Sequence, residues 1–406
     1  MKNIKSTILL VLLFCMFSCI EENKSNKLET GTYRATLKVN DTLDLPFNFE
    51  VVSKNKLHIF NAEEVIEVNN ITYKNDSVYI KTPVFEGYIV AKIEKEALKG
   101  SFTKPSLNRI MLFEAKKSDT RFNIFKTPSF DVSGNWETIF SPNIEEDTYM
   151  AKGIFKQNGN RVTGTFRTTT GDYRYLEGVL NGNQLKLSAF DGAHAFLFTA
   201  RVSDSTMAGT FYSGNHFSES FIAKRNDNFE LPDANELTFL KDGYDKIEFS
   251  FPNENGNMVS LNDARFKDKV VLVQIMGTWC PNCLDESKFY AKYYKSKQNE
   301  DFEIVALAFE YVKTEKAAFK NINRLKESTG ISYPILLAQF GSSSKVKANE
   351  KLPMLNHVLS YPTTIYIDKT GKVRKIHTGF NGPATGNKFI DFKTEFDKFI
   401  EELLSE

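Results

Sequence analysis

Residues 277–286 read GTWCPNCLDE and hold two cysteines, Cys280 and Cys283, that are separated by two residues. Two sulfurs at this spacing can bind a metal, form a structural crosslink, or exchange electrons with another molecule. A crosslink between them would close a very small loop and would therefore restrict the unfolded chain little. The spacing leaves metal binding and thiol–disulfide chemistry as the two functions to compare.

The chain lacks the further ligands that a metal site needs. A zinc site takes about four ligands, commonly two such cysteine pairs or one pair with two histidines. The chain has no second pair, and its five histidines show no metal-binding spacing: His58, His194, His216, His357 and His377. The sequence therefore predicts no metal. It favours electron exchange through a reversible Cys280–Cys283 disulfide, with no other cofactor.

The other two cysteines, Cys15 and Cys19, lie in the N-terminal segment. Residues 8–17 form an apolar run that is too short to span a bilayer and suits a signal peptide. Residues 1–18 resemble a bacterial lipoprotein signal, in which Cys19 is acylated and becomes the mature N-terminus. An ordinary secretory signal with an incidental cysteine is the alternative.

The resemblance to a lipoprotein signal implies an exported chain that a lipid anchors in a membrane. Residues 19–30 are then a polar tether. The anchored protein is expected on a membrane surface that faces the periplasm or in the outer membrane, and exposure at the cell surface is an alternative. Export places the thiols outside the reducing cytosol. The formal net charge of +1 gives no reason to expect a nucleic-acid partner.

The cysteine pair follows a buried strand and begins a helix. Residues 269–276, KVVLVQIM, form a nearly continuous apolar run that is typical of a central strand covered on both faces. Pro281 suits the first helical position, where its missing N–H costs nothing. Cys280 is therefore expected at a helix N-terminus, whose dipole favours a thiolate, and Cys283 one turn inside.

The region from about residue 245 to the C-terminus shows an α/β pattern. The predicted order is strand, cysteine-bearing helix, strand, helix, strand, hairpin and closing helix, with these later elements: strand 301–309, helix 314–328, strand 333–338, hairpin 363–379 and helix 387–404. The apolar stripe of the closing helix is predicted to be core rather than a cofactor site.

Residues 255–286 and 361–373 carry a resemblance to a known family. The first stretch contains the strand and the Trp-Cys-x-x-Cys motif with a Glu three residues beyond, and the second, YPTTIYIDKTGKV, resembles a cis-proline segment. Residues 245–406 resemble the thioredoxin-like fold, and within it the TlpA/ResA-type thiol–disulfide oxidoreductases. Residues 379–386, GFNGPATG, resemble the version found in Bacteroidota lipoproteins.

The resemblance implies roles for the residues of the site. Cys280 is the exposed attacking thiol and Cys283 the buried resolving thiol. Pro362 holds the Tyr361–Pro362 bond cis beside the two sulfurs, so that the backbone of Tyr361 is presented to a client. Trp279 shields the site and offers an apolar surface to partners, or else only packs in the core.

Gln274 occupies the position that holds a buried Asp in thioredoxins proper. An amide cannot take a proton, and TlpA/ResA-type proteins, which share it, use the Glu after the second cysteine. Glu286 matches that residue and is the predicted acid/base or pKa-tuning group. The alternative is a surface Glu that only favours the helix dipole. A peroxidase of the same fold is disfavoured because Gly277 and Gln274 replace its Thr and Pro.

Residues 31–226 are predicted to be all-β, with short alternating segments and Asn-Gly turns at QNGN and LNGN. Similar segments recur roughly 103 to 109 residues apart. We therefore predict two related barrel- or sandwich-like units, residues 31–118 and 131–226, with a single larger β-domain as the alternative. A linker, residues 227–244, and the redox domain, residues 245–406, follow. Three polar residues of the β-region, Glu177, Asp191 and His194, receive no role.

The predicted function is disulfide reduction in client proteins by an exported, membrane-anchored thiol–disulfide oxidoreductase. The Pro-Asn dipeptide between the cysteines lacks the His of strongly oxidising members, so reduction is favoured over oxidation. An upstream electron donor must then restore the dithiol. The alternative is a β-barrel lipoprotein that binds a ligand or partner and carries an accessory redox domain.

Overall fold

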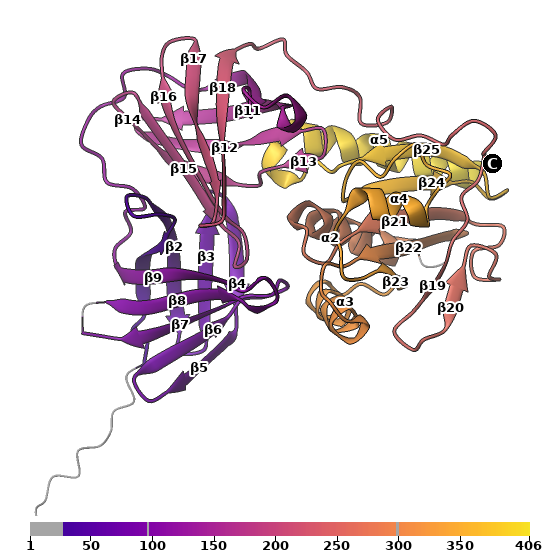
Figure 1. The fold of residues 1–406 in the computed structure, drawn as a ribbon, viewed down its shortest axis with the longest axis horizontal. Coiled ribbons are helices and arrows are strands. Elements are labelled where there is room, and N and C mark those ends of the chain that lie inside the picture. Colours follow the sequence, from indigo (N-terminus) through magenta and orange to yellow (C-terminus); the bar gives the residue numbers. More distant parts are fainter. Residues whose placement is uncertain (1–26, 96, 298–299) are drawn as a thin grey trace, which may run out of the picture.

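The structure is a computed structural model that describes residues 27–95, 97–297 and 300–406. It contains two nine-stranded sheets and a C-terminal α/β part whose largest sheet has five strands. In Figure 1 the two large sheets lie one above the other, and helix α2 (Pro281–Ser296) lies on the side of the α/β part that faces them. The predicted signal, the acylated Cys19 and most of the predicted tether fall outside the described residues.

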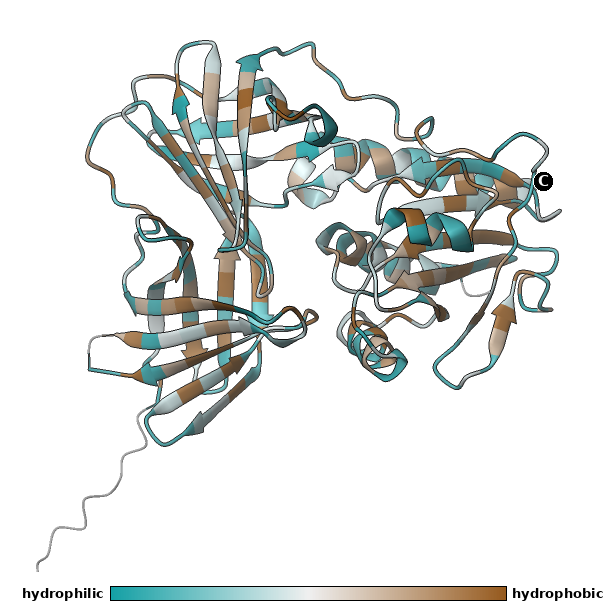
Figure 2. Cartoon of the chain, in the orientation of Figure 1, coloured by the Kyte–Doolittle hydropathy of each residue, from teal (hydrophilic) through white to brown (hydrophobic). Residues whose placement is uncertain are grey.

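The first sheet is an antiparallel meander whose strands alternate buried and more accessible residues, as in β1 (Gly31–Lys38). This period of two, which Figure 2 shows as alternating bands of hydropathy, places one face of each strand on a shared core. The remaining strands are β2 (Asp44–Ser53), β3 (Lys56–Asn61), β4 (Glu64–Val68), β5 (Asn70–Lys74), β6 (Ser77–Lys81), β7 (Tyr88–Ile93), β8 (Leu98–Lys104) and β9 (Arg109–Lys117).

The second sheet repeats this order. Its first strand, β10 (Gly134–Phe140), pairs with the second and the last strand, as β1 does in the first sheet. The others are β11 (Tyr149–Asn158), β12 (Arg161–Thr168), β13 (Gly171–Asp172), β14 (Leu176–Asn181), β15 (Gln184–Phe190), β16 (Ala195–Val202), β17 (Thr206–Ser213) and β18 (Phe217–Arg225). The prediction of two related barrel-like β-units is therefore confirmed.

The two sheets differ in how they close. In the second, β12 pairs with both β11 and β14, which closes the sheet into a barrel. In the first, β4 and β5 form the two ends, and the described strands show no pairing between them. The predicted Asn-Gly turns close two hairpins of the second sheet, with Gly159 and Gly182 at φ near +60°.

Aromatic side chains fill the second barrel. The largest fully buried side chains there include Trp136, Phe140, Phe155, Phe166, Phe198 and Phe221. Phe140 and Phe166 meet edge to face with ring centres 5.5 Å apart, and Phe166 stacks on Phe198 at 4.9 Å. The interior is thus a packed core, in the manner of small barrels.

Arg121 joins the two barrels. Its buried guanidinium donates to the Phe60 carbonyl at 2.9 Å and to the Ser188 hydroxyl at 3.0 Å, which belong to different sheets. Asn61 adds a reciprocal pair of bonds with the backbone of Phe190, each of 3.0 Å. Because Phe190 also packs in the core of the first sheet, the two barrels form one body.

The α/β part has the predicted element order, with two additions. Its five-stranded sheet runs β23-β22-β21-β24-β25, with β21 (Val270–Met276) buried along its whole length at the centre. The other elements are β22 (Phe302–Phe309), α3 (Glu315–Thr329), β23 (Ile335–Gln339), β24 (Thr363–Ile367), β25 (Val373–Thr378) and α5 (Asn387–Ser405). The additions are α4 (Lys345–Lys351) and the hairpin β19 (Ser250–Pro252) with β20 (Met258–Ser260).

In the described ranges, no helix has both the length and the apolar character that crossing a membrane would require.

Candidate active site

Cys280 is the N-cap residue of α2. Its extended backbone precedes Pro281, the first helical residue, and its sulfur accepts a hydrogen bond from the Cys283 N–H at 3.1 Å. A helix N-terminus leaves several N–H groups without partners in the helix, and an acceptor at the cap satisfies one of them. The arrangement therefore places the Cys280 sulfur at the positive end of the helix dipole.

The expectation that Cys280 is exposed is wrong for this structure, in which the residue is only 5% exposed. Its thiol donates to the Tyr361 carbonyl at 3.3 Å, and the Tyr361–Pro362 bond is cis. The Tyr361 backbone therefore faces the sulfur, as the resemblance implied, although it is covered. The structure thus brings Cys280, Tyr361 and Pro362 together.

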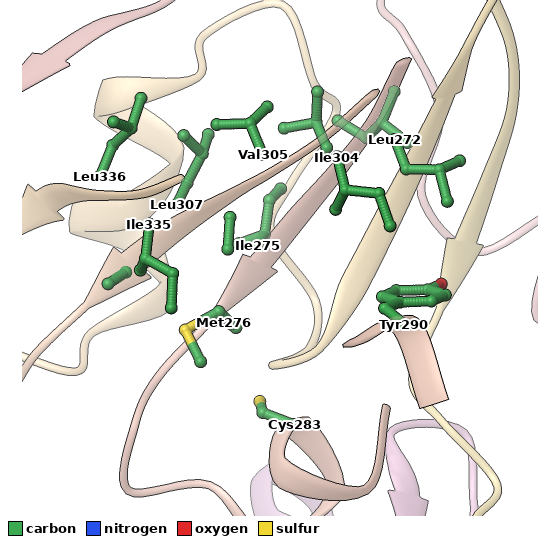
Figure 3. Packing of buried hydrophobic residues seen from close by; sticks show 14 of the residues in the cluster. Leu272, Ile275, Met276, Cys283, Tyr290, Ile304, Val305, Leu307, Ile335 and Leu336 are labelled. Atoms are coloured by element: carbon green, nitrogen blue, oxygen red, sulfur yellow. The ribbon is translucent and has the colours of Figure 1, made fainter. Parts of the chain in front are cut away.

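Cys283 lies one helical turn further in and is fully buried. Figure 3 shows its sulfur pointing from α2 toward the apolar core near Met276. Burial, together with the neighbouring Cys280, raises the pKa of the Cys283 thiol well above its usual value. Both thiols are free in this structure.

Glu286 is fully buried, so it is not the surface Glu of the alternative interpretation. Its carboxyl accepts from Gln274 Nε2 at 2.7 Å, from the Thr364 hydroxyl at 2.9 Å and from the Tyr290 hydroxyl at 3.2 Å. Burial raises its pKa to about 7, although these three bonds act in the opposite direction. A group that titrates near neutral pH can accept or donate a proton at working pH.

Trp279, just before the pair, is held at both its ring and its backbone. Its indole N–H donates to the Phe309 carbonyl at 3.0 Å, and its ring meets Tyr361 edge to face with centres 5.6 Å apart. Trp279 is only partly buried. It therefore packs against the cis-proline segment, and its shielding of the site stays a prediction.

Glu310 is a buried residue beside the site that the sequence did not single out. Its carboxylate accepts from both the backbone N–H and the hydroxyl of Thr278, each at 2.8 Å. Burial raises the pKa of Glu310, which follows directly after β22. The two bonds fix the turn that leads from β21 into the cysteine motif.

Residues of the second barrel also reach the cysteine motif, which the sequence did not predict. His194 Nε2 donates to the Trp279 carbonyl at 3.1 Å, and its Nδ1 lies 2.8 Å from Asp191 Oδ2. Arg174 donates to the Pro281 carbonyl at 3.2 Å. These partners are about 85 to 107 positions apart in the chain, and no local pattern in the sequence marks them. Glu177, in contrast, pairs with Arg161 within the barrel, at 2.8 Å.

The described part of the chain contains no group of three or more His, Cys, Asp or Glu side chains placed to hold a metal ion. The Cys280 sulfur has instead the Tyr361 carbonyl and the Cys283 N–H for neighbours, and the charge of the buried Glu286 acts on Cys283. Two thiols, a backbone carbonyl and a titratable carboxyl are the groups that thiol–disulfide exchange uses.

Comparison with known proteins gives the same result as this geometry. Residues 231–389 match the family described as Redoxin. The thiol–disulfide oxidoreductase ResA of Bacillus subtilis is 31% identical over 140 residues, which cover 34% of this chain and 69% of ResA. Through its C-terminal part, the chain belongs to the TlpA/ResA-type thiol–disulfide oxidoreductases.

Other relatives of this TlpA/ResA-type chain match over the same part. The thioredoxin-like protein YneN of Bacillus subtilis is 27% identical over 140 residues, which cover 34% of this chain and 73% of YneN. Among solved structures, a thiol-disulfide oxidoreductase from Bacteroides fragilis is 19% identical and covers 37% of this chain and 99% of its own, with a TM-score of 0.28. The predicted family is confirmed, and these matches do not reach the two β-barrels.

Proposed function

We propose that this chain reduces disulfides in client proteins, with Cys280 as attacking and Cys283 as resolving thiol. The observation that carries the proposal is the arrangement of the two cysteines. The Cys280 sulfur caps the helix and accepts a hydrogen bond from the Cys283 N–H at 3.1 Å, and the Cys283 thiol is fully buried one turn further along the helix. The family shown for residues 231–389 supports thiol–disulfide exchange in general. The reducing direction is the finer part of the proposal.

The exchange proceeds in two steps that conserve electrons and protons. The Cys280 thiolate attacks one client sulfur, which breaks the client disulfide, forms a mixed disulfide and releases a client thiolate. Cys283 then loses its proton to Glu286 and attacks the Cys280 sulfur, which releases the second client thiolate and leaves a Cys280–Cys283 disulfide. The client has gained two electrons, and an upstream dithiol donor returns two electrons to the chain.

The surroundings of Cys283 support reduction rather than oxidation. A strong oxidant of this kind stabilises its reduced form, usually as a thiolate. Here burial raises the pKa of the Cys283 thiol, and the intervening Pro281 and Asn282 supply no charged group. Beyond the helix-cap bond to the Cys280 sulfur, the dithiol form therefore gains little stabilisation, so we expect the pair to give up its electrons readily.

The reduction potential tests the direction. We expect a value near the thioredoxin range of about −270 mV, measured by equilibrating the full chain with glutathione buffers and following the two thiols by mass spectrometry. The Cys280→Ser variant, which forms no intramolecular disulfide, is the control. A potential near about −120 mV would instead make the chain an oxidant of client thiols.

We also propose that Cys19 carries the lipid that anchors the chain to a membrane after export. The support is the apolar run of residues 8–17 followed by Cys19. In cells fed a labelled fatty acid, the wild type should carry the label and Cys19→Ala should not, whereas Cys15→Ala should keep it. An unlabelled wild-type chain would leave the ordinary secretory signal as the explanation.

A further inference from the structure

One segment of the second barrel lies on the face of the α/β part that holds the cysteine pair. This docking segment, residues 168–174, runs from the end of β12 through β13. The Ser360 hydroxyl donates to the Thr170 carbonyl at 3.0 Å, and the Gly382 N–H donates to the Asp172 carboxylate at 2.6 Å. Together with the bond from Arg174 to the Pro281 carbonyl, the docking segment thus contacts two loops of the α/β part and the start of α2.

The groups under the docking segment are those that a client must reach. Ser360 directly precedes Tyr361, and Pro281 directly follows Cys280. Gly171 lies so close to the motif that a Cβ there would be 1.9 Å from Asn282 Nδ2. Since Gly171 also has a φ of +145°, glycine is required for this approach.

We propose that the docking segment and a client protein compete for the same face of the α/β part, so that this structure is a closed form of the chain. The inference rests on the proposed function, because it takes clients to be proteins that reach the Cys280 sulfur. A client disulfide cannot approach a sulfur that is 5% exposed unless the chain opens around it, and the proposal makes the barrel the part that moves. The β-barrels thereby gain a role: they control access to the dithiol.

Arg174 holds the closed form by its charge. Its buried guanidinium donates to Asp285 Oδ2 at 2.5 Å on α2 and also pairs with Glu64 on the first barrel. Asp172 is a further buried carboxyl at this contact, and burial together with the charge of Asp285 raises its pKa to about 6. Without the guanidinium, carboxylates would face each other across the contact, and the barrel and the α/β part would repel.

The connector between the two parts is fixed at two points that are only a few residues apart. Glu230 is held on the second barrel, where it pairs with Lys152 and lies 3.5 Å from Arg167. Ala234 is held on the α/β part, where its carbonyl accepts from the Thr378 N–H at 2.9 Å. In the proposed opening, the change in backbone torsions falls on the three residues between these anchors, 231–233, so that both anchors stay intact.

The first test is the rate at which a bulky maleimide alkylates Cys280 in the reduced full chain, read by peptide mass spectrometry. Because the rate scales with the open fraction, Arg174→Gln should raise it about ten-fold or more. Arg161→Gln is the matched control, since Arg161 lies on the same barrel and pairs only with Glu177 in the described structure. This reading uses no client, so it can fail while disulfide reduction stands.

Two outcomes of the alkylation experiment would contradict the proposal. If Arg174→Gln folds, as near-ultraviolet circular dichroism would show, and alkylates Cys280 no faster than wild type, the docking segment does not restrict access. If client reduction also falls in that variant, the barrel is part of the client-binding site instead, and the closed form is rejected.

A second measurement does not depend on how the Arg174 variant folds. Hydrogen exchange is followed at residues 168–174 in the Cys283→Ser chain, before and after Cys280 is joined to a disulfide-bonded client. Competition predicts that exchange of this segment becomes faster in the mixed disulfide, while that of β16 is unchanged. Unchanged or slower exchange at residues 168–174 would overturn the proposal.

Discussion

Replacing Cys283 by serine is expected to stop turnover and to turn the chain into a trap for its clients. Cys280 keeps its place at the helix cap and still attacks a client disulfide, but the serine hydroxyl cannot resolve the mixed disulfide because it does not ionise at working pH. Steady-state reduction of a disulfide-bonded protein should therefore fall to the rate of the supplied thiol alone. The mixed disulfide should accumulate and be visible on a non-reducing gel.

The matched variant is Cys280→Ser, and it should behave differently. The remaining thiol, Cys283, is fully buried, so it cannot reach a client and no mixed disulfide should form. A buried serine hydroxyl costs about 1–3 kcal/mol where it lacks a partner, so both variants must first be shown to be folded by urea unfolding. Equal trapping by the two variants would contradict the assignment of attacking and resolving thiols.

The arrangement around the cysteines could be predicted because it depends on local sequence. A continuous apolar run indicated β21, Pro281 indicated the start of α2, and these two elements set where Cys280 and Cys283 lie. Similarly, Thr314 and Gly330 bound the predicted helix α3, as N-cap and as left-handed C-cap. In each case, residues within or directly beside the element determine where it begins or ends.

The contact between the barrel and the cysteine motif could not be predicted, because its partners are distant in the chain. Asp191 and His194 looked like isolated polar residues, yet His194 bonds the Trp279 carbonyl. Arg174 is one arginine among many until the fold places it against Asp285. The burial of Cys280 beside the Tyr361 carbonyl was likewise not predicted, although its position at the start of the helix was.

Replacing Glu286 by glutamine is expected to change both the stability and the pH dependence of the chain. Burial raises the pKa of Glu286 from 4.5 to about 7 in the folded protein. The folded state therefore favours the protonated carboxyl, which contributes stability below pH 4.5 that is lost as pH rises through about 7. Relative to Glu286→Gln, the free energy of unfolding of the wild type should fall by about 3 kcal/mol over this range.

The kinetic effect separates a proton acceptor from a merely buried carboxyl. Resolution of a mixed disulfide, followed by stopped flow, should accelerate in the wild type as pH rises through about 7, because ionised Glu286 can then take the proton of Cys283. In Glu286→Gln this acceleration should disappear and resolution should slow by about 100-fold or more. A Gln variant that keeps the wild-type profile would assign the proton to another group.

Tyr290→Phe is the informative companion, because it keeps the carboxyl and removes one donor. The Tyr290 hydroxyl lies 3.2 Å from Glu286 Oε1 and lowers the pKa of that carboxyl. Without it, the carboxylate is less well stabilised, so the midpoint of the resolution profile should move to higher pH while the maximum rate is retained. If Glu286 accepts the proton, the midpoint of the resolution profile should shift in Tyr290→Phe and the acceleration with pH should be lost in Glu286→Gln. A carboxyl with only a structural role would produce neither change.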